Sequence, residues 1–241
     1  MEITKQTRIG ELVAHDIQHA KTLQTHHIDF CCGGERLLSE VCQEKGLDFE
    51  EIKQQLKSDY TTVAAPTFQF ANWSLDLMID YLVKYHHHYI RSQGPVSYQL
   101  LEKVHQVHGP NHPELKLVKE LFYNSLVDLH QHLDKEEQIL FVFIRKLIAA
   151  EAQQQPLPEF HCGSIENPIG VMMSEHQNEG ILHEKIAQLT HNYTPPADAC
   201  TSYKLALQLL KEFEQNLHIH IHVENNLLFP RAIALQEKLG V

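Results

Sequence analysis

Two stretches of this 241-residue chain share one pattern. The first is His132-Leu133-Asp134-Lys135-Glu136, with Gln138-Ile139-Leu140-Phe141 after it; the second is His220-Ile221-His222-Val223-Glu224, with Asn226-Leu227-Leu228-Phe229 after it. Residues four apart lie on the same face of a helix, one turn above the other. Each stretch therefore offers one imidazole and one carboxylate to the same point. Two such helices facing each other would supply most of a dinuclear metal site.

A single histidine precedes each copy of the motif at a similar distance. His86 lies 46 residues before His132, and His176 lies 44 residues before His220. The two halves of the region from about 72 to 241 thus repeat one arrangement, which indicates a duplicated helical hairpin.

Helical periodicity and chain breaks predict an all-α protein. Long helices are expected over about 73–107 (kinked at Gly94-Pro95), 113–152, 168–192 and 201–238, with prolines or glycines between them. Four long helices with short connections predict an antiparallel four-helix bundle over 72–241. Residues 1–60 predict a small domain of three short helices, and 61–71 a linker. The core of such a small domain is thin, so we expect it to pack on a larger body or on a second copy.

The apolar stripe of each long helix carries a histidine, and two stripes also carry a glutamate. The stripe Leu75, Ile79 and Leu82 leads to His86, which this spacing selects from His86-His87-His88. The same reasoning selects His132, Glu136, His176, His220 and Glu224. Satisfied core histidines or a surface ion pair would explain one such motif. Two buried carboxylates on two helices favour a shared metal centre, because a buried charge without a counter-charge is expensive.

The ligand types narrow the metal. Four imidazoles and two carboxylates without a thiolate exclude a cysteine-rich structural zinc site. Two carboxylates able to bridge, with two imidazoles for each metal, suit a non-haem di-iron centre, although zinc or manganese would accept the same ligands. A two-metal hydrolase is the main competing chemistry, but the carboxylate-rich loops typical of such sites are missing from the sequence.

Neighbouring polar residues have less defined roles. Asp128, one turn before His132, is either an orienting partner of that imidazole or a solvated acid. His183 is expected to be buried two turns after His176. His218 and His222 flank His220 at two-residue spacing, so they should point away from the metal.

A second motif is Asp29-Phe30-Cys31-Cys32-Gly33-Gly34. Adjacent cysteines seldom bond to each other. With a helix expected to start near residue 35, its N-terminus would acidify one thiol. The functional interpretation is redox chemistry or transient binding of iron or a cluster; the alternative is a tight turn that contains two small residues.

Charge and composition exclude several classes. The net charge of −11 without a basic stripe argues against binding to nucleic acid or to anionic membranes. The N-terminal residues contain no apolar signal segment, and no apolar run is long enough to span a bilayer. Five cysteines, an odd number, do not suggest a disulfide framework. We therefore expect a cytoplasmic protein.

The two motifs, in this order, resemble the repair-of-iron-centres family, whose members have a haemerythrin-like bundle. The likeness covers nearly the whole chain and rests on the cysteine turn, Tyr85-His86, His132 to Phe141, Ser174-Glu175-His176, Pro195-Pro196 to Thr201, and His220 to Pro230. It implies two non-haem iron ions per chain, held by His86, His132, His176 and His220, bridged by Glu136 and Glu224, and open to an oxo or hydroxo bridge. It also implies that Cys31 and Cys32 form an N-terminal site.

The resemblance further implies a function. This function is the repair of iron–sulfur clusters damaged by nitrosative or oxidative stress, through donation of iron. The acceptors would be damaged iron–sulfur proteins, and the protein would be a homodimer. The haemerythrin oxygen carriers use five histidines where this chain shows four, which leaves positions for a small ligand. The alternatives are reduction of nitric oxide at the centre, a sensor or storage module for nitric oxide or oxygen without turnover, and, most distantly, a purely structural bundle.

Overall fold

The computed structural model describes residues 1–58 and 69–240, which fold into helices joined by turns and loops. No strand forms within these ranges, although Arg8 and Leu37 make one isolated antiparallel bridge. The all-α prediction is confirmed. Among the described residues, no helix has both the length and the apolar character needed to cross a membrane.

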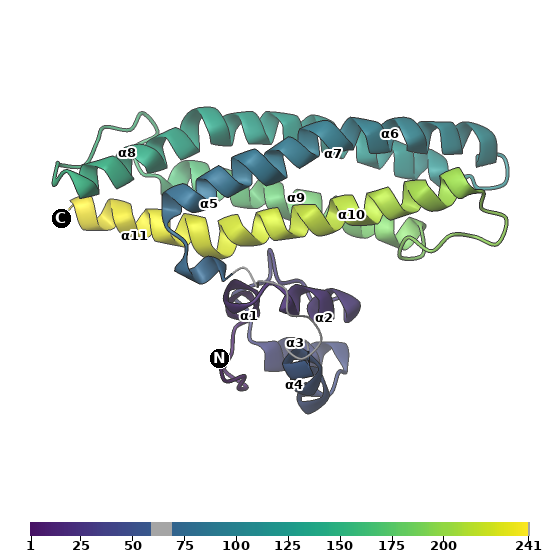
Figure 1. The fold of residues 1–241 in the computed structure, drawn as a ribbon, viewed down its shortest axis with the longest axis horizontal. Coiled ribbons are helices and arrows are strands. Elements are labelled where there is room, and N and C mark those ends of the chain that lie inside the picture. Colours follow the sequence, from purple (N-terminus) through teal and green to yellow (C-terminus); the bar gives the residue numbers. More distant parts are fainter. Residues whose placement is uncertain (59–68, 241) are drawn as a thin grey trace.

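Four long rods lie side by side and form the expected antiparallel bundle (Figure 1). The first rod packs against the second and fourth, and the second against the third. In chain order the rods are α5 (Leu75–Tyr81), η3 (Leu82–His87) and α6 (His88–His108); α7 (Glu114–Lys135), η4 (Glu136–Leu140) and α8 (Phe141–Ala152); α9 (Glu166–Leu189); and α10 (Thr201–Val223), η5 (Glu224–Leu228) and α11 (Phe229–Gly240).

Three of the four rods contain a π-helical turn at the same level of the bundle. These turns are η3, η4 and η5, and each includes or directly follows a histidine or glutamate of the repeated pattern. A π turn bonds residue i to i+5, so it inserts one extra residue into the α-helical register. Such turns occur frequently at functional sites.

The N-terminal unit contains four short helices where the sequence predicted three. They are α1 (Ile9–His15), α2 (His19–Thr25), α3 (Leu38–Lys45) and α4 (Phe49–Ser58); the helix expected to fade near Thr25 is interrupted at Asp16. Gly46 ends α3 with a φ of 67°, a left-handed conformation that glycine adopts readily. Of the expected linker, residues 61–68 lie outside the described ranges, and the 3₁₀ turn η2 (Phe70–Asn72) follows.

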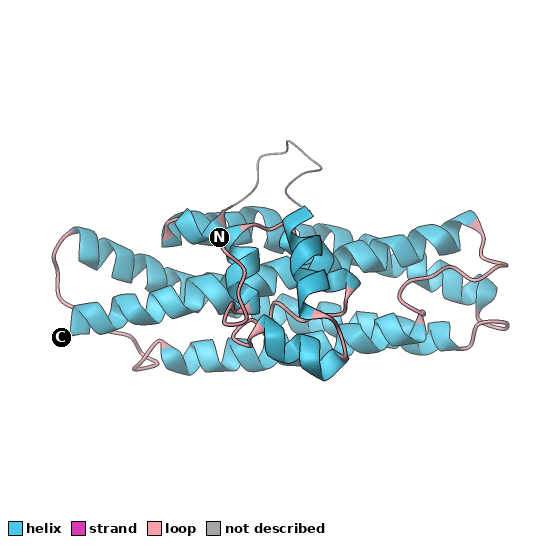
Figure 2. Cartoon of the chain, turned by 90° about the horizontal axis from the view of Figure 1, so that it is seen from below, coloured by secondary structure: helices cyan, strands magenta, loops and turns pink. Residues whose placement is uncertain are grey.

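The N-terminal unit rests against the middle of the bundle, where α1 contacts η5 (Figure 2). Its apolar side chains join one continuous cluster with those of the bundle, for example Phe30 and Leu12 with Phe213 and Leu217. The thin core is therefore completed by the chain's own larger body. A second apolar cluster, which includes Leu140, Phe143 and Phe229, fills the other half of the bundle. A layer of buried histidines and glutamates occupies the core as well.

Candidate dinuclear metal centre

Six side chains from all four rods converge in this polar layer. Two overlapping groups form: His87, Glu136, His220 and Glu224 in one, and His132, Glu136, His176 and Glu224 in the other. Within each group the ligand atoms lie within 4.8 Å of one another. We call the six residues the His/Glu cluster.

Both glutamates belong to both groups, and each directs its two oxygens to different imidazoles. Oε1 of Glu136 lies 3.3 Å from Nε2 of His132, while its Oε2 lies 3.5 Å from Nε2 of His87. Oε1 of Glu224 lies 3.0 Å from Nε2 of His220, and its Oε2 lies 3.1 Å from Nε2 of His176. One oxygen for each group is the arrangement that a carboxylate needs to bridge two cations.

The cluster is buried and short of partners. Glu136 and Glu224 are both 0% exposed, and none of their four carboxylate oxygens has a hydrogen-bond partner among the described residues. The Nε2 atoms of His87 and His220 have none either. Leaving one buried polar atom unsatisfied costs roughly 1–3 kcal/mol. Two divalent cations would satisfy these atoms together, so the donor set fits a metal pair.

Electrostatics within the cluster point the same way. Burial raises the pKa of Glu136, and the charge of Glu224 adds to the effect. Burial also opposes ionisation of Glu224, but the imidazoles of His220 and His176 hold its pKa well below the ordinary value. Burial lowers the pKa of His87 to about 2, which leaves its imidazole neutral and able to donate a lone pair. Two buried carboxylates whose oxygen atoms lie within 4.8 Å of each other repel one another when both are ionised, so nearby cations are needed to balance the two charges.

The structure corrects one expected ligand. His86 belongs to neither group, whereas the adjacent His87 does. His86 is buried, and its Nδ1 pairs with Oδ1 of Asn216 at 3.0 Å. The prediction extended the stripe Leu75, Ile79 and Leu82 with α-helical spacing, but η3 is a π turn. Its extra residue rotates the next inward-facing position from His86 to His87.

The Nδ1 atoms of three cluster histidines have partners that fix the orientation of the rings. Glu137 pairs with His87 at 2.7 Å, Glu175 with His132 at 2.8 Å, and Asn225 with His176 at 2.8 Å. Each partner accepts the Nδ1 proton and thereby leaves Nε2 free for a metal. Nδ1 of His220 has no hydrogen-bond partner in the described ranges.

Sequence reasoning missed these partners. Of the two roles considered for Asp128, the structure favours a solvated acid: the residue is exposed, and Glu175 on the facing helix is the partner of His132. Lys135 in turn binds Glu175. These contacts join helices distant in sequence; the only local signal was that Glu175 directly precedes His176.

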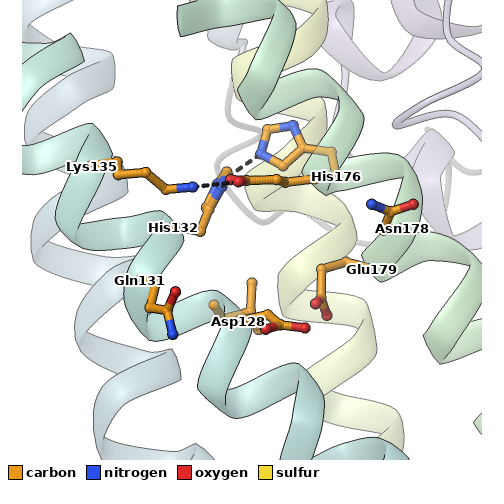
Figure 3. Close-up of a pocket in the computed structure, with 9 residues that line it drawn as sticks. Asp128, Gln131, His132, Lys135, His176, Asn178 and Glu179 are labelled. Carbon is orange, nitrogen blue, oxygen red and sulfur yellow. Dashed lines mark hydrogen bonds and ion pairs between the residues drawn. The ribbon is translucent and has the colours of Figure 1, made fainter.

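A cavity of about 160 Å³ opens beside one edge of the cluster (Figure 3). It lies between α7 and α9, and its wall includes His132 and His176 but neither His87 nor His220. The remaining lining residues are Asp128, Leu129, Gln131, Lys135, Glu175, Asn178 and Glu179. The group that contains His132 and His176 is therefore the one that borders a cavity.

Three further histidines lie apart from the cluster, as expected for His218 and His222, and His183 is buried as predicted. His183 is buried beside Ser125, whose hydroxyl also donates to Glu179 at 2.6 Å. His218 and His222 face the N-terminal unit, where their rings lie 6.2 and 5.8 Å from the ring of Phe30.

The cysteine turn is a separate, smaller group. Asp29, Cys31 and Cys32 lie within ligand distance of one another, and Oδ1 of Asp29 accepts the backbone N–H of both cysteines. The thiols are free, with 4.0 Å between their sulfur atoms. The expected acidification does not hold for Cys31: contact with Cys32, burial and the Asp29 charge raise its pKa well above the ordinary value. The following helix begins only at Leu38, too far along the chain to favour a thiolate.

Comparison with known proteins gives the same two parts. Residues 78–232 match the hemerythrin HHE cation binding domain, and residues 5–60 match a domain of unknown function, DUF542. The probable iron-sulfur cluster repair protein of Haemophilus influenzae is 36% identical over 95% of this chain and 97% of its own length. The iron-sulfur cluster repair protein YtfE of Yersinia pseudotuberculosis is 35% identical over 93% of this chain and 96% of its own length. The chain therefore belongs to the family of iron-sulfur cluster repair proteins that carry a haemerythrin-type cation-binding domain.

Proposed function

We propose that the chain carries two iron ions in the His/Glu cluster and donates iron to damaged iron–sulfur clusters. The names of the relatives support the repair role. The observation that carries the proposal is the pair of buried glutamates, each with one oxygen toward each group. The five cysteines are all unpaired, which fits the cytoplasm as the site of action.

The two groups differ in how readily they would release an ion. All four histidines are at most 3% exposed, but only His132 and His176 form part of the cavity wall. We therefore assign iron release to the position held by His132 and His176, with Glu175 and Glu179 as carboxylates along the exit. The better enclosed position would keep its ion longer. Because of this difference, the ion at the His132–His176 position would be released first, and the other ion would stay bound.

The test mixes the chain, loaded with iron-57, with inorganic sulfide and a metal-free or nitric-oxide-damaged iron–sulfur protein. A ferrous chelator competes in solution. We expect the label to appear in the rebuilt cluster at a rate that the chelator does not abolish, and Glu224→Leu to transfer none. If the chelator abolished labelling of the acceptor, the iron would have passed through free solution, and this result would contradict direct donation.

Reduction of nitric oxide is the second candidate function, and the cavity favours it, because a space of about 160 Å³ beside His132 and His176 accommodates small molecules. Bound iron would supply one-electron chemistry and exchangeable coordination positions. The protein side chains would exclude bulk water and hold the rings in place. Formation of nitrous oxide without loss of iron would favour this function over donation, and reversible gas binding without either would favour a sensor.

Homodimerisation remains a proposal from the family resemblance. The N-terminal unit already packs on its own bundle, so a thin core no longer argues for a second copy. Light scattering of the full chain and of a chain lacking residues 1–60 tests it; an unchanged oligomeric state would contradict a dimer formed through this unit.

A further inference from the structure

Asn225 occupies an unusual position between the two candidate sites. It follows Glu224 directly in the π turn η5. Its Oδ1 lies 2.8 Å from Nδ1 of His176, and its Nδ2 donates to the carbonyl oxygen of Cys31 at 3.4 Å. One side-chain amide therefore touches a residue of the His/Glu cluster and the backbone of the cysteine turn.

These two contacts fix the tautomer of His176. A backbone carbonyl only accepts hydrogen bonds, so the NH₂ group of Asn225 must face Cys31. The amide oxygen then faces His176, and an oxygen acceptor requires the proton of the imidazole on Nδ1. In the neutral imidazole the lone pair then lies on Nε2, which is 3.1 Å from Oε2 of Glu224 and 3.0 Å from Nε2 of His132. The backbone of the cysteine turn thus determines which nitrogen of His176 is free for a metal.

The cysteine turn is held firmly against the same segment. Nδ2 of Asn226 donates to the carbonyl oxygens of Phe30 and Cys31, both at 3.1 Å. Gly34 makes this approach feasible, since a Cβ atom there would lie 2.2 Å from Oδ1 of Asn226. On the other side, the sulfur of Cys32 lies 4.0 Å from the Cβ position of Gly180, one turn beyond His176 on α9.

His176 differs from the other oriented histidines of the cluster. The Nδ1 partners of His87 and His132 are carboxylates, Glu137 and Glu175, which belong to the bundle itself. Among these three histidines only His176 has a neutral amide as partner, and within the described ranges only this partner also contacts the N-terminal unit. It also belongs to the group beside the cavity.

We infer that Asn225 is a positioning residue that couples the cysteine turn to metal binding at the His132–His176 position. The inference rests on the proposed metal site and adds that the cysteine turn influences how tightly this site binds metal. Displacement of the Cys31 carbonyl, for example by modification of the adjacent thiols, allows the Asn225 amide to rotate and thereby weakens metal binding by His176. Coupling is reciprocal: a metal that holds His176 must also change the accessibility of the cysteine turn.

Three variants of the full chain separate the steps. Asn225→Leu removes both contacts. Asn225→Asp, at about pH 8 where a carboxyl is ionised, keeps an acceptor for His176 but loses the donor to Cys31. Asn216→Leu is the matched control, because Asn216 makes the equivalent contact to His86, which lies outside the cluster. Circular dichroism of the metal-free proteins establishes that each variant folds, and if Asn225→Leu does not fold, Asn225→Asp carries the test of the coupling by alkylation.

Binding of Co²⁺, followed by equilibrium dialysis and by its ligand-field absorption, reports on the metal. We expect Asn225→Leu to lower the affinity for one of the two ions by about 10- to 100-fold, the usual effect of losing a hydrogen-bond partner of a metal-binding histidine. Asn216→Leu should bind Co²⁺ with wild-type affinity. Asn225→Asp should keep the affinity. An Asn225→Leu protein with wild-type affinity and absorption overturns the positioning role. A wild-type chain that binds no Co²⁺ overturns the proposed metal site together with this inference.

Alkylation of Cys32 by iodoacetamide, measured by mass spectrometry of the Cys31–Cys32 peptide, reports on the coupling. In wild type and Asn216→Leu the rate should differ between the metal-loaded and metal-free protein. In Asn225→Leu and Asn225→Asp the two rates should agree. Equal rates in wild type overturn the coupling. Protection that persists in both Asn225 variants means that the thiols bind the metal themselves, which also overturns it.

Discussion

Replacing His87 by leucine removes one imidazole from the group of His87, Glu136, His220 and Glu224, and leaves the group of His132 and His176 complete. We expect the chain to retain about one metal ion instead of two. Loss of a mere outer partner of a metal-bound histidine costs up to about 100-fold in affinity, so loss of the imidazole itself costs at least that much, or about 2.8 kcal/mol at 1.4 kcal/mol per factor of ten.

His86→Leu is the matched control in the same π turn. His86 is 1% exposed, its Nε2 has no described partner, and it contacts Asn216 rather than a cluster glutamate. Its replacement removes the hydrogen bond to the half-buried Asn216, a cost of about 0.5–1.5 kcal/mol in the free energy of unfolding, but the metal content should stay at two.

The assay measures metal per chain after loading and dialysis, then release to a chelator, with urea unfolding of the metal-free proteins to separate stability from binding. Metal lost from His86→Leu and kept by His87→Leu would refute the shifted register. Equal losses from both would mean that the cluster holds five histidines.

Three further outcomes follow from the structure. Glu136→Leu and Glu224→Leu should both bind little metal, yet Glu136→Leu should be more stable than wild type without metal in urea unfolding, because it removes a buried carboxylate whose pKa burial raises; a less stable metal-free Glu136→Leu protein would argue against the burial cost. Burial raises the pKa of Glu179 from 4.5 to about 7, so the folded chain loses stability as the pH rises from about 4.5 to about 7, by up to about 3 kcal/mol at 1.36 kcal/mol per pH unit. Glu179→Gln should remove this loss, so that the variant is more stable than wild type near pH 8 but not near pH 5. The same difference in the free energy of unfolding between variant and wild type at both pH values, measured by urea unfolding, would contradict this prediction. Glu175→Gln weakens the acceptor of the His132 Nδ1 proton and should speed metal release to a chelator about 10- to 100-fold, while an unchanged rate would show that Glu175 does not tune this ligand.

Local spacing made much of the protein predictable from its sequence. A histidine and a glutamate four apart on an apolar stripe must share a helix face, so His132 with Glu136 and His220 with Glu224 could be assigned without a structure. Proline and glycine breaks predicted the four long helices within a few residues. The cost of two buried carboxylates indicated a metal centre whichever partners they met.

Tertiary structure decided what depends on packing between distant segments. Periodicity assumes a regular helix, and nothing in Leu82 to His87 marks the π turn that exchanges His86 for His87. Glu175 and Asn225 reach their histidines from other helices, at sequence separations of 43 and 49 residues. The cysteine turn packs on Asn225 and Asn226, which lie more than 190 residues further along the chain. Hydrogen bonds between side chains so far apart in sequence have no local signature, because only the packed bundle brings their atoms within 3 Å or so of each other.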